Sequence, residues 1–395
     1  MNKETILVFL LSLLLRSLLM PFPHSGEQNY HGSKTAYGGD YEAQRHWMEI
    51  TLHLPLSQWY KYDTKYWGLD YPPLIAYGSC AMGWLSSKFV GEDSVALFES
   101  RGYEDPVHKA FMRSTVIFWD AFIYFPMVYI IARRLGEGSK DRTLMICLGA
   151  MIQPSLVAID NGHFQYNNVC LGLALGAFHF MTLSNNIGFN DVIASVLFCL
   201  SLNWKQMALY YAPAVFAYLL GKCFRGHGVG ILRNVALLGV SVVATFFTLW
   251  FPFYFYREET NETIIEVFGS ILRRIFPFSR GLFEGKVANI WCAANVRPLS
   301  IRGRIPSDLQ PYCALVLTLA MMLPCCVLLF ITGRQESKPL EKLTNLLWGS
   351  AGTSLAFFLA SFQVHEKVRQ KDNICVRIFH HTSLKPTLHR VFFCH

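Results

Sequence analysis

Charged residues are scarce in this 395-residue chain, since Asp, Glu, Lys and Arg make up only 16% of it. A soluble domain usually carries about 25% charged residues. Hydrophobic residues reach 52% and aromatic residues 15%. This balance argues against an ordinary soluble domain and predicts a membrane protein. The formal net charge of +8 suits a protein that lies beside anionic lipid or that handles phosphates.

Several other features are missing altogether. The sequence has no basic run interleaved with aromatic residues and no zinc-finger spacing, so we expect no binding to nucleic acid. None of the eleven cysteines forms a Cys-x-x-Cys pair, so we expect neither a zinc site nor a thioredoxin-like centre. Most cysteines lie in apolar runs, where they act as small apolar residues of helices. The sequence also shows no internal repeat and no low-complexity segment.

Apolar runs are abundant. A bilayer-spanning helix needs about 20 mostly apolar residues. Nine runs approach this length, at residues 4–21, 110–132, 143–160, 168–184, 190–203, 206–222, 231–255, 311–332 and 343–362. The first could be a signal peptide, but we favour an uncleaved anchor, because its apolar run is long, it contains Arg16 and no small-residue cleavage site follows.

Residues 72–90 are a tenth candidate, weakly hydrophobic because they include Pro72, Pro73 and Lys88. If this segment lies on the membrane and the N-terminus is cytosolic, the short basic loops all face the cytosol, as the positive-inside rule requires. These loops carry Arg133, Arg134, Lys140 and Arg142, then Lys222, Arg225 and Arg233, then Arg334, Lys338 and Lys342. We therefore predict an interfacial helix at 72–90.

The same topology predicts two large lumenal loops, at about 22–109 and 256–310. The second loop is basic and contains Asn261 in an Asn-Glu-Thr glycosylation sequon, which could be used only in the lumen. All the polar motifs of the chain fall on this side of the membrane.

The first motif, GDYEAQRHW, opens an amphipathic pattern in the first of these loops. We expect Asp40 at the N-cap of a helix and Glu42 in its first turn. Capping would explain Asp40 alone. It would not explain why Gln44, Arg45 and His46 follow so closely, and this density indicates a functional surface.

The second motif, WGLDYPPL, holds Asp70 on a stiff turn, because two prolines fix an extended approach followed by a helix start. Asp70 could cap this helix. The alternative is a carboxylate fixed at the membrane surface between Trp67 and Tyr71, whose rings favour the interface and can stack on sugars. A rigid frame suits a catalytic group, because misplacement of such a group is costly.

Four more polar motifs follow at the same membrane edge, where such runs are unfavourable unless they meet water or substrate. They are DNGHFQYNN with His163 and Gln165, NWKQM with Lys205 and Gln206, RGLFEGKVANIW with Arg280, Glu284 and Lys286, and FQVHEK with His365, Glu366 and Lys367. Lys205 either snorkels to the surface or binds a lipid phosphate. Each motif alone could be a solvated loop, and their coincidence on one side is the informative fact.

In this order the motifs GDYEAQRHW, WGLDYPPL, GHFQYN, RGLFE-KVANIW and FQVHEK resemble those of the eukaryotic dolichyl-phosphate-glucose-dependent α-1,3-glucosyltransferases. The resemblance covers about residues 1–367, and its wording is closer to the members that add the first glucose than to those that add the second. It implies one all-α polytopic domain with the C-superfamily (GT-C) glycosyltransferase fold. It also implies residence in the endoplasmic reticulum membrane and a lumenal active site.

The resemblance further implies a reaction. Glucose would pass from dolichyl phosphate glucose to the nine-mannose dolichyl-pyrophosphate oligosaccharide in α-1,3 linkage, in the N-glycosylation precursor pathway. Asp70 maps onto the aspartate taken as the general base of the family. Inversion is one in-line displacement, which needs one base, and cations must stabilise the phosphate that leaves. No lumenal Asp-x-Asp is present to hold a metal, and the family is regarded as metal-independent, so we expect neither metal nor cofactor.

Basic residues must then neutralise the phosphate, and the candidates are Lys205, Arg280, Lys286, His365 and Lys367. The full expected substrate-binding set is Asp40, Glu42, Arg45, His46, Trp67, Tyr71, His163, Gln165, Lys205, Gln206, Arg280, Glu284, Lys286, His365, Glu366 and Lys367. Membrane lipid is a further expected partner, and we expect a monomer.

The sequence departs from the family after Lys367, where a basic, His-rich tail at 368–395 stands in place of further spans. We therefore expect an alternative or truncated C-terminus, and the alternative function is a catalytically incomplete form of the enzyme. A second-glucose transferase, a dolichyl-phosphate-mannose-dependent transferase and a non-catalytic scaffold also stay open. A transporter or lipid flippase is disfavoured by the absence of an inverted repeat.

Overall fold

The computed structural model describes residues 3–27, 38–258, 261–276, 282–283, 289–296 and 300–362, and every secondary-structure element within these ranges is a helix. Five helical segments there are long and apolar enough to cross a membrane: Pro106–Leu135, Lys140–Gly162, Val229–Phe255, Gln310–Arg334 and Pro339–Ala360. Two shorter apolar helices are Asn167–Met181 and Phe189–Trp204. The chain is thus an all-α, polytopic membrane protein, as predicted.

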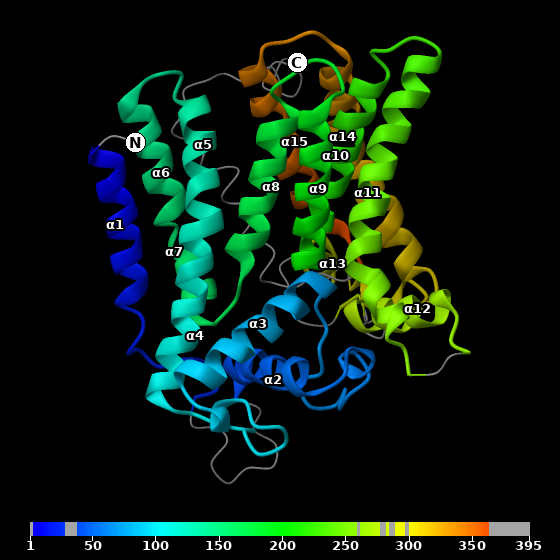
Figure 1. Cartoon of the computed structure of the whole chain (residues 1–395). Coiled ribbons are helices and arrows are strands. Elements are labelled where there is room, and N and C mark those ends of the chain that lie inside the picture. Colours follow the sequence, from blue (N-terminus) through cyan, green and yellow to red (C-terminus); the bar gives the residue numbers. More distant parts are fainter. Residues whose placement is uncertain are drawn as a thin grey trace.

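A bundle of roughly parallel and antiparallel helices forms the body of the molecule (Figure 1). Its members are α1 (Lys3–Ser17), α4–η3–α5 (Pro106–Trp119, Asp120–Tyr124, Phe125–Leu135), α6–α7–η4 (Lys140–Met151, Pro154–Leu156, Val157–Gly162), α8 (Asn167–Met181), α9 (Phe189–Trp204), η5–α10 (Gln206–Tyr211, Ala212–Cys223), α11 (Val229–Phe255), α14 (Gln310–Arg334) and α15 (Pro339–Ala360). Each predicted span falls on one of these helical segments.

The basic loops and the polar motifs lie at opposite ends of the bundle. Consecutive members run in opposite directions, so the connections alternate between the two ends (Figure 1). The loops that carry the three basic clusters follow α5, α10 and α14, at the upper end in that view. The motifs at 39–47, 66–74, 160–168 and 203–207 lie at the lower end. This is the sidedness that the positive-inside rule predicts.

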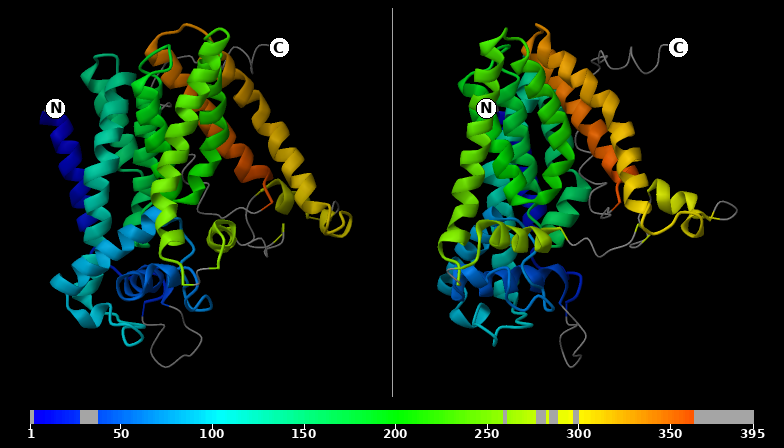
Figure 2. Two further views of the ribbon diagram at one scale, coloured as in Figure 1. Left: turned by 45° about the vertical axis from the view of Figure 1, so that its right-hand side comes forward. Right: turned by 90° about the vertical axis from the view of Figure 1, so that its right-hand side faces the viewer.

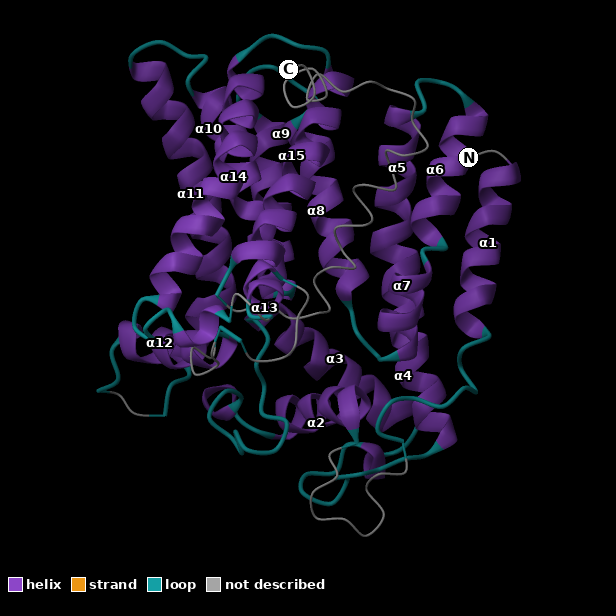
Figure 3. Cartoon of the chain, turned by 180° about the vertical axis from the view of Figure 1, so that it is seen from behind, coloured by secondary structure: helices purple, strands orange, loops and turns teal. Residues whose placement is uncertain are grey.

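Shorter helices cover the lower end (Figure 3). They are α2 (Gly39–His53), η1 (Leu56–Gln58), α3 (Pro73–Phe89), η2 (Glu92–Ser94), α12 (Ile264–Ile275), α13 (Ile290–Ala294) and η6 (Ile301–Gly303). α2 and α12 run across the bundle axis, while α3 lies obliquely against α2 (Figure 2). α3 corresponds to the expected interfacial helix at 72–90, and it is not among the segments that are long and apolar enough to cross.

α2 begins earlier than the motif indicated. Gly38 and Gly39 have φ values of +39° and +66°, which glycine adopts readily because it has no Cβ. The chain therefore turns into the helix before it reaches Asp40. Gly38 occupies the N-cap, and Asp40 and Glu42 both lie in the first turn. The expectation that Asp40 is the N-cap is wrong.

A hydrophobic cluster at the lower end joins the two large loops. Its buried members come from α2, the turn after η1, the segment before α3, α3 itself, α11 and α12: Ala43, Trp47, Ile50, Trp59, Tyr60, Leu69, Ala76, Trp250, Phe253, Val267, Ile271 and Ile275. The rings of Trp250 and Phe268 meet edge to face at 5.5 Å. This packing holds α12 against the first loop.

α11 and α14 expose apolar side chains along much of their length. Val240 and Val243 on α11, and Val316 and Leu323 on α14, are each more than half exposed. A helix that is apolar all round is typical of a membrane span. α14 also leans away from the rest of the bundle toward the lower end (Figure 2). These faces therefore have the apolar character of membrane-spanning helices.

Candidate active site

Asp70 lies on a short segment between Trp67 and the start of α3. Pro72 is the N-cap residue of α3 and Pro73 is its first helical residue. Proline disfavours the helical conformation in the residue before it, so α3 cannot extend back toward Asp70. Capping of α3 therefore does not account for Asp70. Trp67 has a φ of +36°, which is unusual for a bulky residue and often marks a functional turn.

The backbone of residues 67–71 is held by side chains from elsewhere in the protein. Each of the five consecutive carbonyl oxygens accepts a hydrogen bond from a side chain. The donors are Trp47 Nε1 to Trp67 (2.8 Å), Arg274 Nη2 to Gly68 (2.8 Å), Arg274 Nε to Leu69 (3.2 Å), Gln206 Nε2 to Asp70 (3.4 Å) and the Tyr60 hydroxyl to Tyr71 (2.7 Å). The sequence predicted a rigid frame from two prolines, and the structure adds these four side chains to it.

Tyr71, Gln165 and Lys205 meet beside this segment. The Tyr71 hydroxyl donates to Gln165 Oε1 at 3.1 Å, and Lys205 Nζ donates to the same oxygen at 2.7 Å. Lys205 Nζ also lies 4.7 Å from the centre of the Tyr71 ring. Lys205 is 2% exposed, so it does not snorkel to the surface. The phosphate-binding alternative for Lys205 therefore stays open.

Carboxylates surround Tyr71 as well. Burial raises the pKa of the Tyr71 hydroxyl well above its usual value, and the charges of Asp70, Asp40 and Asp160 raise it further. Tyr71 therefore stays protonated and remains a hydrogen-bond donor. The charges of Asp40 and Asp70, which come from two separate motifs, thus both act on Tyr71.

The 160–168 motif supplies Gln165 to the site. Asp160 Oδ1 accepts from Asn167 Nδ2 at 2.6 Å, and Asp160 Oδ2 accepts from the Asn168 backbone N–H at 2.7 Å. The Gln165 backbone N–H donates to the Asp160 carbonyl at 3.1 Å. These bonds close the loop and aim Gln165 at Tyr71. His163 is half-buried where η4 ends.

A buried ion pair between bundle helices supports this loop, and sequence reasoning missed it. Arg16 on α1 donates through Nε to Asp120 at 2.7 Å, with both side chains at most 1% exposed. Asp120 also accepts from Asn168 Nδ2 at 2.9 Å and from Asn161 Nδ2 at 3.3 Å. Asp120 and Asn161 lie in the π-helical segments η3 and η4, and such segments occur frequently at functional sites.

The charged groups of the first motif bind mainly one another. The Arg45 guanidinium donates to Glu42 at 2.6 and 2.8 Å and to Glu49 at 2.8 Å, and His46 Nδ1 lies 3.1 Å from Glu49. All four side chains are at most 1% exposed. Burial alone would raise the pKa of Glu49, but the hydrogen bond with His46 and the charge of Arg45 lower it to about 2. Direct substrate contact by Glu42, Arg45 or His46 stays a prediction.

The last two motifs are only partly described. Arg280, Glu284, Lys286, His365, Glu366 and Lys367 lie outside the described residues, as does the tail at 368–395. Trp291 Nε1, at the end of the fifth motif, donates to the Ala360 carbonyl of α15 at 2.7 Å. Leu282, from the same motif, packs in one cluster with Trp291 and with Phe362, where the sixth motif begins. The described parts of these two motifs thus lie together.

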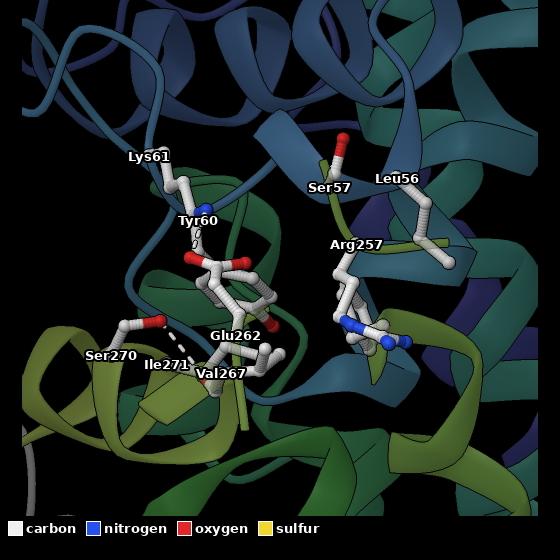
Figure 4. A pocket seen from close by; sticks show the side chains of 10 residues that line it. Leu56, Ser57, Tyr60, Lys61, Arg257, Glu262, Val267, Ser270 and Ile271 are labelled. Atoms are coloured by element: carbon white, nitrogen blue, oxygen red, sulfur yellow. Dashed lines mark hydrogen bonds and ion pairs between the residues drawn. The ribbon is translucent and has the colours of Figure 1, made fainter. Parts of the chain in front are cut away.

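A pocket opens between the first loop and α12 (Figure 4). Its lining residues are Leu56, Ser57, Tyr60, Lys61, Phe253, Arg257, Glu262, Val267, Ser270 and Ile271. Lys61 and Glu262 form an ion pair of 2.9 Å on one side of it. Tyr60 lines the pocket and also donates to the Tyr71 carbonyl, so the pocket adjoins the Asp70 segment without including Asp70.

Like Tyr60, Arg274 holds the Asp70 segment and was not singled out by the sequence. It was one of several basic residues in the second large loop. The spacing of Val267, Ile271 and Ile275 predicts the buried face of α12, and Arg274 lies next to that face. From this pattern we could have predicted Arg274 at the edge of a packed interface. The sequence of α12 alone does not indicate that its partners are the carbonyls of Gly68 and Leu69.

Together these features define a polytopic, all-α membrane protein in which the segment that carries Asp70 meets the buried Lys205 through Tyr71, at one end of the bundle. The family model of the ALG6, ALG8 glycosyltransferase family matches residues 12–369 of the chain. The chain belongs to this family.

Curated relatives agree with this assignment. The chain is 43% identical to "Dolichyl pyrophosphate Man9GlcNAc2 alpha-1,3-glucosyltransferase" of Rattus norvegicus over 348 residues, which are 86% of this chain and 64% of the relative. It is 40% identical to the protein of the same name from Saccharomyces cerevisiae, over 91% of this chain and 62% of the relative. A relative from Arabidopsis thaliana, named as a probable enzyme of this kind, is 38% identical over 91% of this chain and 63% of the relative. The chain thus spans less than two thirds of the length of these relatives.

Proposed function

We propose that this chain is a glucosyltransferase. It moves glucose from dolichyl phosphate glucose to the nine-mannose dolichyl-pyrophosphate oligosaccharide and forms an α-1,3 linkage. Membership of the family and the names of the relatives support this activity. The structural observation that carries the proposal is Asp70, on a segment whose carbonyls are held by four side chains and whose neighbour Tyr71 contacts the buried Lys205.

In the proposed reaction Asp70 acts as the general base. Its carboxylate takes the proton from the attacking mannose hydroxyl while the hydroxyl oxygen forms a bond to C1 of glucose. The bond from C1 to the phosphate oxygen breaks, and dolichyl phosphate leaves with the electron pair. Attack from the face opposite the phosphate converts the β-linked donor into an α-linked product, so one displacement with one base is enough.

Lys205 is proposed to stabilise the phosphate that leaves. Charge that develops on the phosphate oxygens is best stabilised by a cation that is already in place. Lys205 meets this condition because Gln165 and Tyr71 hold its ammonium group. Arg280, Lys286, His365 and Lys367 remain predicted contributors. We propose that the reaction needs no metal, because these basic residues would neutralise the phosphate that leaves.

We also propose the orientation. All nine predicted spans would cross the endoplasmic reticulum membrane, with the Asp70 end in the lumen and the basic loops in the cytosol. The separation of the basic loops from the polar motifs supports this orientation. The enzyme would act as a monomer in the GT-C fold.

A substrate panel tests the function. Microsomes that lack the endogenous enzyme would receive this chain, with labelled dolichyl phosphate glucose or dolichyl phosphate mannose as donor. The acceptors would be the nine-mannose oligosaccharide and its monoglucosylated form. We expect transfer only from the glucose donor to the nine-mannose acceptor. Transfer to the monoglucosylated acceptor would favour the second-glucose reaction, and transfer from the mannose donor would overturn the donor assignment.

A further inference from the structure

The side chain of Arg274 on α12 forms hydrogen bonds to the segment that carries Asp70. Its Nη2 donates to the Gly68 carbonyl at 2.8 Å, and its Nε donates to the Leu69 carbonyl at 3.2 Å. These are the two carbonyls that directly precede Asp70. Arg274 lies more than 200 residues further along the chain and belongs to the other large loop, so the contact joins two distant parts of the site.

The geometry of Gly68 matches this contact. A Cβ at position 68 would lie 2.6 Å from Arg274 Nη2 and 2.9 Å from the Cα of Thr64. Any larger residue would therefore push the guanidinium away from the carbonyls. Gly68 and Arg274 fit each other as a pair.

The guanidinium suits two consecutive carbonyls, because its planar fork presents Nε and Nη donors at a fixed spacing. In the part of the chain that the structure describes, no carboxylate lies within ion-pair distance of Arg274. The hydrogen-bond capacity of Arg274 is directed at the backbone next to Asp70. Its role is thus different from that of Arg45, which lies between two carboxylates.

α12 is itself firmly placed. A capping box forms at its start: the Glu266 backbone N–H donates to the Thr263 hydroxyl at 3.3 Å, and the Thr263 backbone N–H donates to the Glu266 carboxylate at 2.7 Å. Val267, Ile271 and Ile275 are buried in the cluster that joins the two loops. The Arg274 side chain therefore extends from a fixed support.

We propose that Arg274 is a positioning residue for the transfer reaction, which holds the backbone before Asp70 so that the carboxylate meets the acceptor hydroxyl. This inference rests on the proposed function. The bonds to the segment from Trp47, Gln206 and Tyr60 do not depend on Arg274, so the fold survives its loss. The Asp70 carboxylate would then sample more positions, and a misplacement of about 1 Å can cost about 100-fold in rate.

The chain offers a matched control. Arg273 is the neighbour of Arg274 on α12 and is exposed to solvent. Arg273→Met and Arg274→Met remove the same charge from the same helix. We expect Arg274→Met to lower kcat by about 10- to 100-fold with KM within about twofold for both substrates. We expect Arg273→Met to stay within about twofold of the wild type, because surface substitutions of this kind usually have small effects.

Two further variants separate positioning from a general structural role. Arg274→Lys keeps the charge and one donor group, so it should restore part of the lost kcat. Gly68→Ala displaces the guanidinium and also crowds the Cα of Thr64, so it should lower kcat at least as much as Arg274→Met. Both changes break the same contact. The double variant Gly68→Ala/Arg274→Met should therefore have about the kcat of the less active single variant, and the two losses should not add.

Hydrogen exchange of the full chain in lipid nanodiscs measures the contact without reference to activity. Amides in residues 64–71 should exchange at least about tenfold faster in Arg274→Met than in Arg273→Met. Equal exchange rates in Arg274→Met and Arg273→Met would show that Arg274 does not hold this segment. Faster exchange in Arg274→Met with an unchanged kcat would contradict the positioning role. If the wild type shows no transfer, the proposed function fails, and the positioning role of Arg274 fails with it. The hydrogen-exchange rates still decide whether the contact between Arg274 and residues 68 and 69 exists.

Discussion

Lys205 Nζ lies 2.7 Å from Gln165 Oε1 and 4.7 Å from the centre of the Tyr71 ring. The three residues come from separate motifs, and Lys205 is almost fully buried. A cation in such a poorly hydrated place attracts an anion more strongly than a cation in water does. This is the physical reason for proposing that Lys205 meets the phosphate of the donor.

Replacement of Lys205 by Met should lower kcat by about 100-fold or more, because removal of one preorganised donor to a developing oxyanion typically costs that much. The measurement is glucosyl transfer in microsomes at matched expression. Lys61→Met is a suitable control, since Lys61 is an exposed cation of the first large loop and pairs with Glu262. Equal transfer by both variants would contradict the role of Lys205.

The Arg16–Asp120 pair yields a prediction about stability. Arg16→Met should lower the free energy of unfolding by about 3 kcal/mol, because it leaves the buried Asp120 with only neutral amide donors. Arg16→Met/Asp120→Asn should recover part of this loss, since no unpaired charge remains. Thermal unfolding in detergent micelles is the measurement, and an unchanged midpoint in the single variant would contradict the pairing.

The general plan of the molecule could be predicted from the sequence, because it follows from local rules. Span length depends on runs of apolar residues, and sidedness depends on the loops around Arg133, Lys222 and Arg334. The start of α3 follows from Pro72 and Pro73. The same two prolines predict a stiff turn at Asp70; in the structure Asp70 lies on a segment whose carbonyls are held by four side chains.

The remainder depends on packing between distant segments. Arg16 served only as an argument against a signal peptide, yet it pairs with a residue 104 positions away. Arg274 was one basic residue among several, and its partners are more than 200 positions away. Neither pairing leaves a periodic pattern in the sequence. For Asp40 a local signal was misleading. Aspartate is a common N-cap residue, but the positive φ values of Gly38 and Gly39 start the helix before Asp40.

Glu49 predicts a dependence of stability on pH. Its pKa is about 2 in the folded protein and about 4.5 in the unfolded chain, so the unfolded state binds the proton more readily. The stabilisation is thus complete above about pH 5 and is lost as the pH falls toward about 2. Glu49→Gln should unfold at a lower temperature than the wild type at pH 6, and the gap should narrow as the pH falls through 4 to 3. A gap of constant size between pH 6 and pH 3 would contradict this account.

Metal independence can be tested directly. Because Lys205 and the predicted basic residues would neutralise the phosphate, transfer should persist at an unchanged rate after treatment with EDTA. The control is the same preparation supplied with excess Mg²⁺ or Mn²⁺, which should add nothing. Loss of transfer in EDTA and its recovery on addition of one of these metals would mean that a cation is part of the site.

The central claim is that Asp70 is the general base, and the most direct test compares the wild type with Asp70→Asn and Asp63→Asn at equal expression. Asp63 lies in the same loop but pairs with Arg101 at 2.6 Å, so Asp63→Asn controls for loss of a carboxylate near the site. Labelled dolichyl phosphate glucose and the nine-mannose acceptor are supplied, and the glucosylated lipid is counted. The account predicts transfer by the wild type and by Asp63→Asn and a loss of at least about 100-fold in Asp70→Asn. Transfer by Asp70→Asn at the wild-type rate would contradict it.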